Sequence, residues 1–481
     1  IRQRTRQNAG SQITATFILA VAITSIGSGF QHGYNTGVLN TPEEVIKGWM
    51  SAELDTPSTS SMKIIWSTVV SIFCIGAMVG GGFAGACANN LGRKGALMMN
   101  NVFAFIAAII MGITRTTEVP YLLMVGRFII GINCGLNAGL APLYINEVSP
   151  TKIRGAMGSL YQLNITIAIL IAQLLGTSTA LGTETLWPLL MGLIGIVGFL
   201  QLVGFFFCPE SPKYILEKKN DEQGTKMVLD RLVGSNSHQQ FIELKKDIED
   251  AQSLPKVTLS QMVRQKKLRT PLIIIGVLMA AQQLSGVNAV IFYSTEIFKM
   301  GKLSDEAAQY ATVGVGVINV LTTIVSVWLV EKFGRKPLLL VAFGGLTICM
   351  TILFICLYFV ETSPFAKYLS IVIVFVYLVF FAIGAGSIPW LLGPELFNTA
   401  ARPTAISIAV PINWFFTFAV GLLFPPLQAV MQQAVFLIFI VCSVCAFIFI
   451  WFFAPETKNK TIDEITALFE RNSWRCRLFD C

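Results

Sequence analysis

Carboxamide side chains recur inside the most apolar stretches of this sequence. Three of them, Gln282, Gln283 and Asn288, stand almost side by side in "AAQQLSGVNAVIFYS". A buried carboxamide without a hydrogen-bond partner is costly, so each must bond to another helix or face water and a ligand. A single amide would indicate a bond between helices, whereas a set from several apolar runs favours a shared binding site. The set is Gln162, Gln282, Gln283, Asn288, Asn319 and Asn413.

The neutrality of this set indicates the kind of ligand. A carboxamide offers two N–H donors and two acceptor lone pairs without carrying a charge. Vicinal hydroxyl groups need donors and acceptors together, so the set suits a neutral, polyhydroxylated ligand. Trp390 in "GAGSIPWLL" and Trp414 in "PINWFF" add flat apolar faces on which the C–H surface of such a ligand can lie.

The composition predicts that membrane-spanning helices position these residues. Of the 481 residues, 54% are hydrophobic and 13% charged, and the mean hydropathy is +0.66. About a quarter of the residues in an ordinary soluble protein are charged. A span of about 20 apolar residues crosses the hydrocarbon core of a bilayer. We therefore expect an all-α membrane protein with twelve spans, at 13–34, 62–88, 95–114, 121–144, 156–178, 187–207, 271–298, 308–330, 337–360, 367–393, 403–424 and 430–453.

Charged motifs repeat between the two halves of the chain. "NNLGRKGAL" is echoed by "EKFGRKPLL", "EVSPTKIR" by "ELFNTAAR", and "PESPK" by "PETKN", at offsets between 242 and 248 residues. Three echoes in one order predict two parallel halves of six spans, which can rock about a site between them. The segment between them reads as short amphipathic helices at "KMVLDRL", "FIELKKDIEDA" and "LSQMVRQKKL". The predicted units are an N-terminal half at 1–207, linker helices at 208–269, a C-terminal half at 270–454 and a tail at 455–481.

The repeated motifs place Glu and Arg at the same spacing in both halves. These side chains can pair within a half or across the halves, and can hold one face of the protein shut. The alternative is a set of solvated charges beside the membrane, which is the usual fate of Lys and Arg in loops. The repetition favours a gating network. Its predicted members are Arg93, Glu147, Arg154, Glu210, Glu331, Arg335, Glu395, Arg402 and Glu456.

Lys and Arg are unevenly distributed between the two sides of the predicted bundle. Six lie on one side, Arg127 lies within a span, and the other 28 of the 35 lie on the opposite side. The positive-inside rule therefore puts both termini in the cytoplasm. Topology explains the net charge of +8, so no nucleic-acid partner is indicated.

"CSVC" at 442–445 is better explained as small apolar residues one helical turn apart than as a metal site, and we expect no metal, no cofactor and no enzymatic activity.

Over nearly its whole length the sequence resembles the facilitative glucose transporter family, sugar porters of the major facilitator superfamily. The motifs that carry the resemblance are, in order, "QHGYNTGV", "GRK", "YINEVSPTKIRG", "YQL", "PESPKY", "QQLSGVNA", "VEKFGRKPL", "IPWLLGPELF" and "PETKNKT". The resemblance implies a hexose uniporter of the cell membrane, with D-glucose as the expected substrate, that works by rocker-type alternating access. A monomer would suffice for transport. The six carboxamides and Trp390 would contact the sugar, the charged set would form the inner network, and "GAGSIPW" would gate access.

Some residues depart from the pattern of the glucose-carrying members. Ala382 stands where those members usually have a glutamate, and Met279 to Ala281 replace the "QLS" associated with glucose selectivity. Against this, Trp390 is kept where a fructose-selective relative has a small residue. A uniporter for fructose or for both hexoses is therefore an open alternative.

Proton coupling is the other alternative. A proton symporter needs a titratable group in its pathway, and the proton-coupled sugar porters that this sequence resembles carry an aspartate in the first span. Here that position is Asn35, and an amide cannot bind the coupling proton. His32 is the remaining titratable candidate, although a polar pathway residue without a coupling role is the favoured interpretation. Arg127 is expected to meet the charged network near Glu147 or Glu331.

Overall fold

The structure is a computed structural model that describes residues 14–55, 59–150, 153–253, 257–398, 400–458, 460 and 462–470. The side chains of a few residues inside these ranges, Arg154 among them, are not described. The regular secondary structure of the described residues is entirely helical.

Eleven helical segments of the described chain are long and apolar enough to cross a membrane, and the last, Arg402–Phe453, contains two helices. The prediction of twelve spans is therefore confirmed. The spans of the first half are α1 (Ala15–Gly37), α3 (Thr59–Leu91), α4 (Arg93–Ile113), α5 (Tyr121–Val148), α6 (Arg154–Leu175) and the pair α7 (Trp187–Gly192) and α8 (Ile194–Phe207). Those of the second half are the pair α13 (Lys266–Leu284) and α14 (Val287–Met300), α15 (Asp305–Phe333), α16 (Arg335–Tyr358), the broken span α17 (Pro364–Phe380), η2 (Phe381–Ala385) and α18 (Ile388–Leu396), then α19 (Arg402–Met431) and α20 (Phe436–Phe453).

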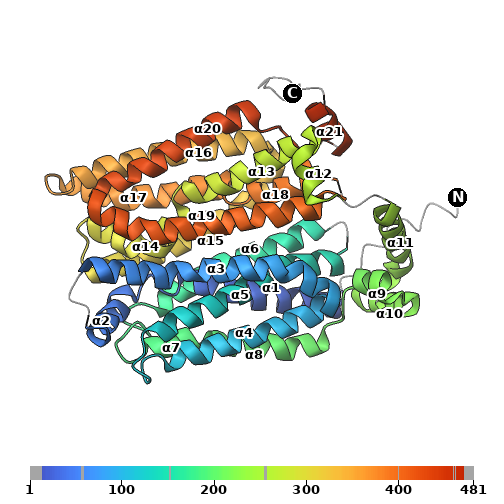
Figure 1. Cartoon of the computed structure of the whole chain (residues 1–481), viewed down its shortest axis with the longest axis horizontal. Helices are drawn as coiled ribbons and strands as arrows, with labels where there is room; N and C mark the ends of the chain where they lie inside the picture. Colours follow the sequence, from blue (N-terminus) through green and yellow to red (C-terminus); the bar gives the residue numbers. More distant parts are fainter. Residues whose placement is uncertain are drawn as a thin grey trace.

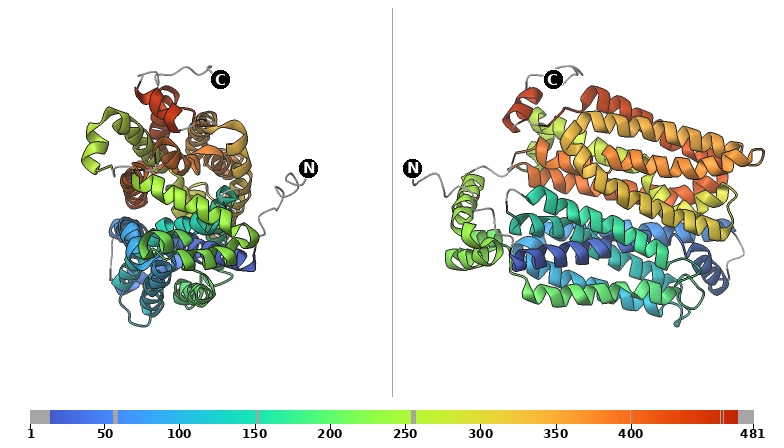
Figure 2. Two further views of the ribbon diagram at one scale, coloured as in Figure 1. Left: turned by 90° about the vertical axis from the view of Figure 1, so that its right-hand side faces the viewer. Right: turned by 180° about the vertical axis from the view of Figure 1, so that it is seen from behind.

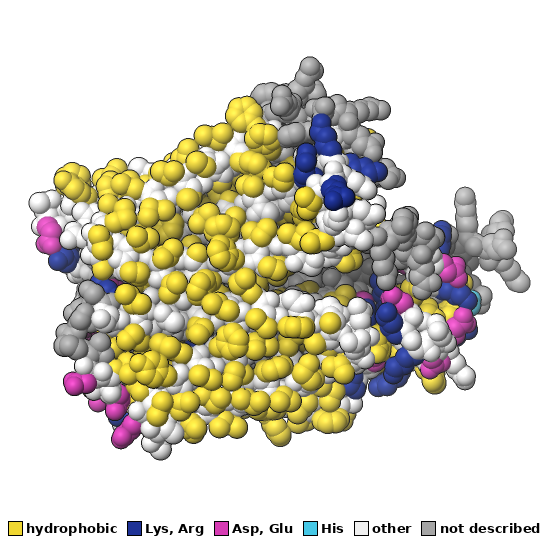
Figure 3. Space-filling view, viewed as in Figure 1, with side chains coloured by type: hydrophobic (Ala, Val, Ile, Leu, Met, Phe, Trp, Pro, Cys, Tyr) yellow, Lys and Arg dark blue, Asp and Glu magenta, His cyan; other side chains and the backbone are white. Residues whose placement is uncertain are grey.

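The two halves lie side by side as two layers of roughly parallel helices (Figure 1, Figure 2). Short helices gather at the two ends of the bundle. One end carries α2 (Glu43–Glu53) and is called the α2 end. The other, called the linker end, carries α9 (Pro212–Lys219), α10 (Glu222–Val233), α11 (Ser237–Ser253), α12 (Leu259–Arg264) and α21 (Ile462–Glu470). Apolar side chains cover the visible flank between these ends, and charged side chains lie at the ends, as a membrane protein requires (Figure 3).

Glycine allows neighbouring spans to approach until their backbones touch. A Cβ atom on Gly80 of α3 would lie 2.1 Å from the carbonyl oxygen of Ile132 on α5. A Cβ atom on Gly131 would lie 2.1 Å from the carbonyl oxygen of Phe73. The small residues near Gly80 therefore serve close helix packing, which is how small residues are used between helices in membranes.

The hydrogen bonds and ion pairs that join the two halves lie at the α2 end, as far as the described residues show. Asn40 Nδ2 donates to the carbonyl oxygen of Ile291 (2.6 Å) and to Ser294 Oγ (2.7 Å). Gln309 accepts from the backbone N–H of Ser178 at 3.0 Å. The α2 end is therefore held closed by polar contacts in this conformation.

Two predicted elements are divided by backbone breaks. The expected span 271–298 ends as α13 at Leu284 and resumes as α14 at Val287, because Gly286 adopts a positive φ of 96°. The expected single helix at "LSQMVRQKKL" is wrong, because Gln265 is extended (ψ 118°) and separates α12 from α13.

Candidate binding site

A carboxamide network lies at the break between α13 and α14. Gln283 Nε2 donates to Asn413 Oδ1 (3.0 Å) and to Gln282 Oε1 (3.2 Å). Asn413 Nδ2 also donates to Gln282 Oε1, at 2.8 Å. Asn288 Nδ2 donates to Gln283 Oε1 and, at 3.5 Å, to Thr417 Oγ1. The structure therefore brings together four of the six predicted amides, from α13, α14 and α19.

The break in the seventh span explains why these amides converge. Gln282 and Gln283 lie in the last turn of α13, and Asn288 lies in the first turn of α14. A Cβ atom on Gly286 would lie 2.9 Å from the ring of Phe439, so glycine is required both by the positive φ and by the close approach. All three amides are buried, and each finds hydrogen-bond partners.

Gln282 connects this network to the broken tenth span. Its Nε2 donates to the carbonyl oxygens of Ala385 (2.6 Å) and Gly386 (2.7 Å). Ala385 ends the π-helical turn η2, and short π-helical turns frequently occur at functional sites. A rearrangement of the amides would therefore reach the "GAGSIPW" segment directly.

The other predicted contacts lie apart from this network. Gln162 on α6 is exposed, whereas Asn319 on α15 is buried. Neither side chain has a hydrogen bond to another described residue, so their donors and acceptors are free for a ligand. Trp390 on α18 is 41% exposed and borders an apolar recess together with Met279. Among the described residues, the structure brings none of these three into hydrogen-bond contact with the amide network.

An aromatic contact joins the two halves beside the amides. His32 Nδ1 on α1 lies 3.2 Å from Tyr161 Oη on α6. The His32 ring centroid lies 5.7 Å from that of Trp414 on α19, which is next to Asn413. Neither Tyr161 nor Thr417 was among the predicted site residues, although the sequence shows Thr417 at a position where an asparagine is common in the family that this chain resembles. Thr417 follows Asn413 by one helical turn, so helical spacing alone would have placed it on the same face.

Not every buried carboxamide belongs to this site. Gln31 Nε2 donates to Asn101 Oδ1 (2.9 Å) and to Gln201 Oε1 (2.7 Å). Gln201 Nε2 in turn donates to Ser28 Oγ at 2.8 Å. These side chains come from α1, α4 and α8, within the first half, and they satisfy one another. They are hydrogen bonds between helices of a kind that stabilises membrane bundles.

Arg127 does not meet the charged network, so that expectation is wrong. It is buried, and its Nη1 donates to the carbonyl oxygen of Asn35 at 2.7 Å. Its guanidinium lies 4.7 Å from the ring centroid of Phe73, and its Nη2 lies 3.5 Å from the carbonyl oxygen of Val70. Backbone carbonyls and an aromatic ring therefore receive this cation. No ion pair joins it to a carboxylate of the described residues.

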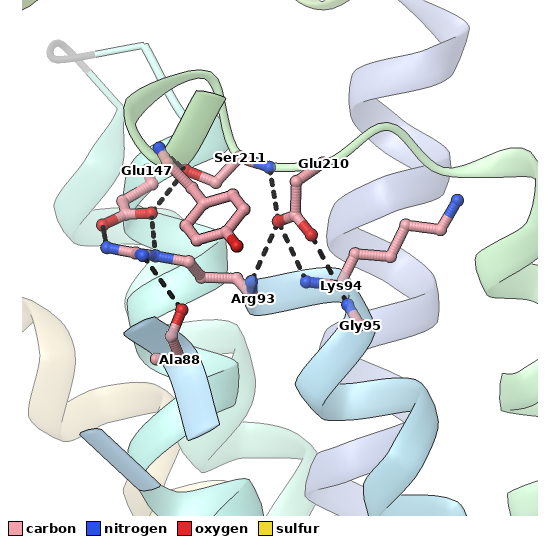
Figure 4. Close-up of polar contacts among 8 residues, drawn as sticks. Ala88, Arg93, Lys94, Gly95, Glu147, Glu210 and Ser211 are labelled. Carbon is pink, nitrogen blue, oxygen red and sulfur yellow. Dashed lines mark hydrogen bonds and ion pairs between the residues drawn. The ribbon is translucent and has the colours of Figure 1, made fainter. Parts of the chain in front are cut away.

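A charged cluster of the first half lies at the linker end (Figure 4). Arg93 forms a two-bond ion pair with Glu147, through Nε (2.7 Å) and Nη2 (2.9 Å). Glu210 Oε1 accepts the backbone N–H groups of Arg93 and Lys94, both at 3.0 Å. A carboxylate is favourable there, because these N–H groups begin α4 and have no partner within the helix. Ser211 donates its hydroxyl to Glu147 and completes the cluster.

The second half repeats this cluster. Arg335 pairs with Glu395 through Nη2 (2.6 Å) and Nε (3.1 Å). Glu456 accepts the N–H groups of Arg335 and Lys336 at the start of α16, both at 3.0 Å. Thr457 takes the place that Ser211 has in the first half. Each cluster joins one half to the segment that directly follows it, the linker in the first case and the tail in the second. In this conformation no ion pair of the described residues joins the two clusters.

The remaining predicted network residues lie outside these clusters. The side chain of Arg154 is not described. Glu331 is exposed and forms no ion pair with a described residue. Arg402 directs Nη2 to the carbonyl oxygen of Phe397 at 3.5 Å, and its Nε has no partner. The structure therefore brings together six of the nine predicted residues, three in each half.

Ion pairs cross between the halves at the α2 end. Lys47 of α2 contacts Glu43 and lies 3.5 Å from Glu296 of α14. Lys299 lies 3.5 Å from Glu44 in the opposite direction. Burial raises the pKa of Glu43 to about 7, with Lys47 opposing this shift. Burial acts to lower the pKa of Lys47, but Glu43 and Glu296 hold it above its usual value.

The described residues contain no group of three or more His, Cys, Asp or Glu that could hold a metal ion.

Known proteins are similar to this chain both in sequence and in fold. The family model described as sugar (and other) transporter matches residues 20–469. Solute carrier family 2, facilitated glucose transporter member 1 of Gallus gallus is 40% identical over 469 residues, which are 96% of this chain and 95% of that protein. Member 3 of Mus musculus is 41% identical over 466 residues, which are 96% of this chain and 94% of that protein.

Solved structures of a bacterial sugar transporter superimpose on this chain. The inward open conformation of the xylose transporter XylE from E. coli matches with a TM-score of 0.79 and 26% identity, over 94% of this chain and 99% of that one. The proton:xylose symporter XylE bound to 6-bromo-6-deoxy-D-glucose matches with a TM-score of 0.77 and 26% identity, over 95% of this chain and 100% of that one. Because the family model and the relatives each span almost the whole chain, this protein belongs to the facilitative glucose transporter family of sugar porters, has the twelve-helix major facilitator fold, and is not an enzyme.

Proposed function

We propose that this protein is a facilitative uniporter for a hexose, with D-glucose as its substrate. The carboxamide network carries the proposal. Its four amides bond to one another, to Thr417 and to backbone carbonyls, so no charged side chain participates. Such a site can exchange hydrogen bonds with sugar hydroxyls without burying a charge. Two relatives are facilitated glucose transporters by name, which supports D-glucose.

The free amides provide the first contacts for the sugar. Gln162 and Asn319 come from α6 and α15, which pack against each other across the halves. In this proposal they bind hydroxyls directly, while Gln283 and Asn413 exchange their mutual bonds for bonds to the sugar. Trp390 offers its exposed ring to the C–H face of the sugar. The site is thus assembled from both halves.

The surroundings of Arg127 support uniport. Its nearest partner on α1 is the carbonyl oxygen of Asn35, whose own side chain donates to the Gln31 carbonyl at 2.8 Å. Neither group can take up a proton near neutral pH. Proton symport remains the second candidate, because one structural relative is a proton:xylose symporter by name and because His32 is titratable.

Fructose is an alternative substrate. Ala382 is buried in η2, close in sequence to the carbonyls that bind Gln282, and offers no side-chain hydrogen bond. The protein would transport fructose, or both hexoses, if the hydrogen bond missing at Ala382 weakens glucose binding more than the contact with Trp390 strengthens it. Ala382→Glu should then raise the preference for glucose.

Alternating access would use the two ends of the bundle in turn. The halves, 1–207 and 270–454, would rock about the amide network. The present conformation is closed at the α2 end, and opening that end would break the contacts of Asn40, Lys47 and Lys299 with the opposite half. By the positive-inside rule, the linker end and both termini would lie in the cytoplasm. The membrane in question would be the cell membrane. Closing the linker end would bring the Arg93 and Arg335 clusters toward each other.

Uptake into sealed proteoliposomes tests the function. Labelled D-glucose and D-fructose are compared, each with and without an imposed proton gradient. Uniport of glucose predicts equilibration without overshoot, whatever the gradient. Accumulation above the external concentration would instead establish symport and direct attention to His32, and movement of fructose alone would overturn the proposed substrate.

Paired variants test the site. Gln283→Ala removes bonds of the carboxamide network and should raise the apparent KM for glucose about tenfold, as expected for one or two lost hydrogen bonds. Gln201→Ala is the matched control, because Gln201 belongs to the separate amide cluster of the first half. An equal change of KM in both variants, or no change in Gln283→Ala, would contradict the assignment of the site.

A further inference from the structure

We propose that α12 and the first turn of α13 form a binding surface for anionic phospholipids in the bilayer leaflet at the linker end. This surface, called the α12 surface, is defined by Leu259, Val263, Arg264, Lys267 and Arg269. It is separate from the carboxamide network, so the proposal does not depend on which sugar is carried or on how transport is coupled.

The charged side chains of this stretch are all positive. Between Gln252 and Thr295 the sequence contains no Asp or Glu. Arg264, Lys267 and Arg269 are exposed, and within the described part of the chain none of them forms an ion pair. The other linker helices differ, because Lys245 of α11 pairs with Glu222 of α10 at 2.7 Å.

The helix beneath these cations adds to the positive potential. α13 begins at Lys266, its first turn contains no acidic residue, and Gln265 at the N-cap makes no side-chain capping bond. The N-terminus of a helix carries partial positive charge, so cations there oppose the helix dipole. An anion at this position would oppose the charge of the side chains and the positive end of the helix dipole together.

Apolar side chains lie beside the charges. Leu259 and Val263, one helical turn apart on α12, are 58% and 53% exposed. Met262 of the same helix is fully buried, which anchors α12 against the protein. A capping box between Thr258 and Gln261 fixes its first turn. The exposed pair is therefore held outward by a rigid helix.

The position of α12 places this surface at the membrane boundary. Thr404 Oγ1 of α19 donates to the carbonyl oxygen of Val257 at 2.8 Å, which fastens the start of α12 to the second half. α12 lies at the linker end beside the start of α13 (Figure 1), and Lys and Arg side chains gather there next to the apolar flank (Figure 3). Gln265, Lys267 and Phe469 of α21 border an open recess at the same place.

This combination fits a lipid better than a soluble anion. Apolar side chains enter the region between headgroups and acyl chains, while adjacent cations bind anionic headgroups. A free phosphate would use the cations and leave Leu259 and Val263 in water. Each cation near an anionic leaflet contributes about 1 kcal/mol, which for a single charge is a factor of about five.

Quenching by brominated lipids tests the proposal. Leu259→Trp is introduced into the full-length protein, and the protein is reconstituted in phosphatidylcholine vesicles with a small fraction of brominated lipid. The brominated lipid is either phosphatidylserine or phosphatidylcholine, and the signal of the protein without the new tryptophan is subtracted. The proposal predicts that brominated phosphatidylserine quenches at least about fivefold more effectively.

Charge-removal variants locate the effect. Arg264→Gln, Lys267→Gln and Arg269→Gln together should abolish the preference for phosphatidylserine. The matched control removes the exposed cations Lys218, Arg231 and Lys246 of the other linker helices in the same way, and should keep the preference. If the triple variant is not recovered in folded form, Arg264→Gln alone and a titration with NaCl should each reduce the preference.

Three outcomes would overturn the proposal. Equal quenching by the two lipids would mean that the α12 surface does not select anionic headgroups. An unchanged preference in the triple variant would place the anionic lipid elsewhere on the protein. Complete loss of the preference in millimolar inorganic phosphate at constant ionic strength would show that the surface binds a soluble anion.

Discussion

Asn40 forms three hydrogen bonds between the two halves, and its removal should open the α2 end. Its Nδ2 donates to the carbonyl oxygen of Ile291 (2.6 Å) and to Ser294 Oγ (2.7 Å). Its Oδ1 accepts the backbone N–H of Thr295 at 3.2 Å. Asn40 is buried, and all three partners belong to α14 of the second half. Asn40→Ala removes the three bonds together.

The size of the effect follows from the number of bonds. Each buried hydrogen bond contributes about 1 kcal/mol net, so three contribute about 3 kcal/mol to the closed conformation. The ratio of open to closed molecules changes tenfold for each 1.4 kcal/mol, and it should therefore rise about a hundredfold. The net value already includes the hydrogen bonds that the freed groups form with water in the open conformation, so these bonds should not change the ratio further.

Thiol labelling measures this ratio. Thr312 of α15 is fully buried beside Thr295, with 2.9 Å between the two hydroxyl oxygens. Thr312→Cys, with the native cysteines replaced by alanine, provides a reporter that an impermeant reagent reaches only when the α2 end opens. Reagent added at the α2 side of oriented vesicles should label this cysteine up to about a hundredfold faster in the Asn40→Ala background.

Asn164→Ala is the matched control. Asn164 Nδ2 donates to Ser25 Oγ (2.7 Å) and to the carbonyl oxygen of Leu160 (2.9 Å), so its bonds lie within the first half. This variant should lower overall stability without changing the labelling rate. An unchanged rate in Asn40→Ala, or an equal increase in both variants, would refute the view that Asn40 closes the α2 end.

Three further predictions use the same structure. Gln282→Ala removes two bonds to the carbonyls that end η2, so backbone hydrogen exchange at 381–390 should accelerate by the equivalent of about 2 kcal/mol, and unchanged exchange would show that Gln282 does not hold this segment. Gln173 is buried against Gly316 of the opposite half with neither amide atom bonded, so Gln173→Leu should stabilise closure by about 1–3 kcal/mol and slow labelling of the cysteine reporter. Burial in the closed conformation raises the pKa of Glu43 from 4.5 to about 7, so the closed form binds a proton more tightly than a form with exposed Glu43. Acidification at the α2 side from about pH 8 to pH 5.5 should therefore favour closure and slow labelling, and a pH response that survives Glu43→Gln would assign it to another group.

The charged clusters mark how far repetition in the sequence can predict structure. The echo of "GRK", Glu147 and Glu210 in the second half predicted that the same residue types would meet in both halves, and each half does assemble an Arg with two Glu. Repetition did not decide whether the pairs form within or across the halves. That choice depends on how the two halves are oriented, which no local motif encodes.

The features that could be predicted from the sequence are those that a bilayer and local spacing impose. Apolar runs of sufficient length have to become spanning helices, and carboxamides within them have to find partners or a ligand. Which partners the carboxamides find depends on how the helices pack. Gln282 reaches Ala385 across 103 positions of sequence, and Arg127 turns to the carbonyl of Asn35 rather than to a carboxylate. The physical reason is that an amide or a guanidinium bonds to whichever group close helix packing brings within about 3 Å, and that packing is set by side chains along the whole length of the spans.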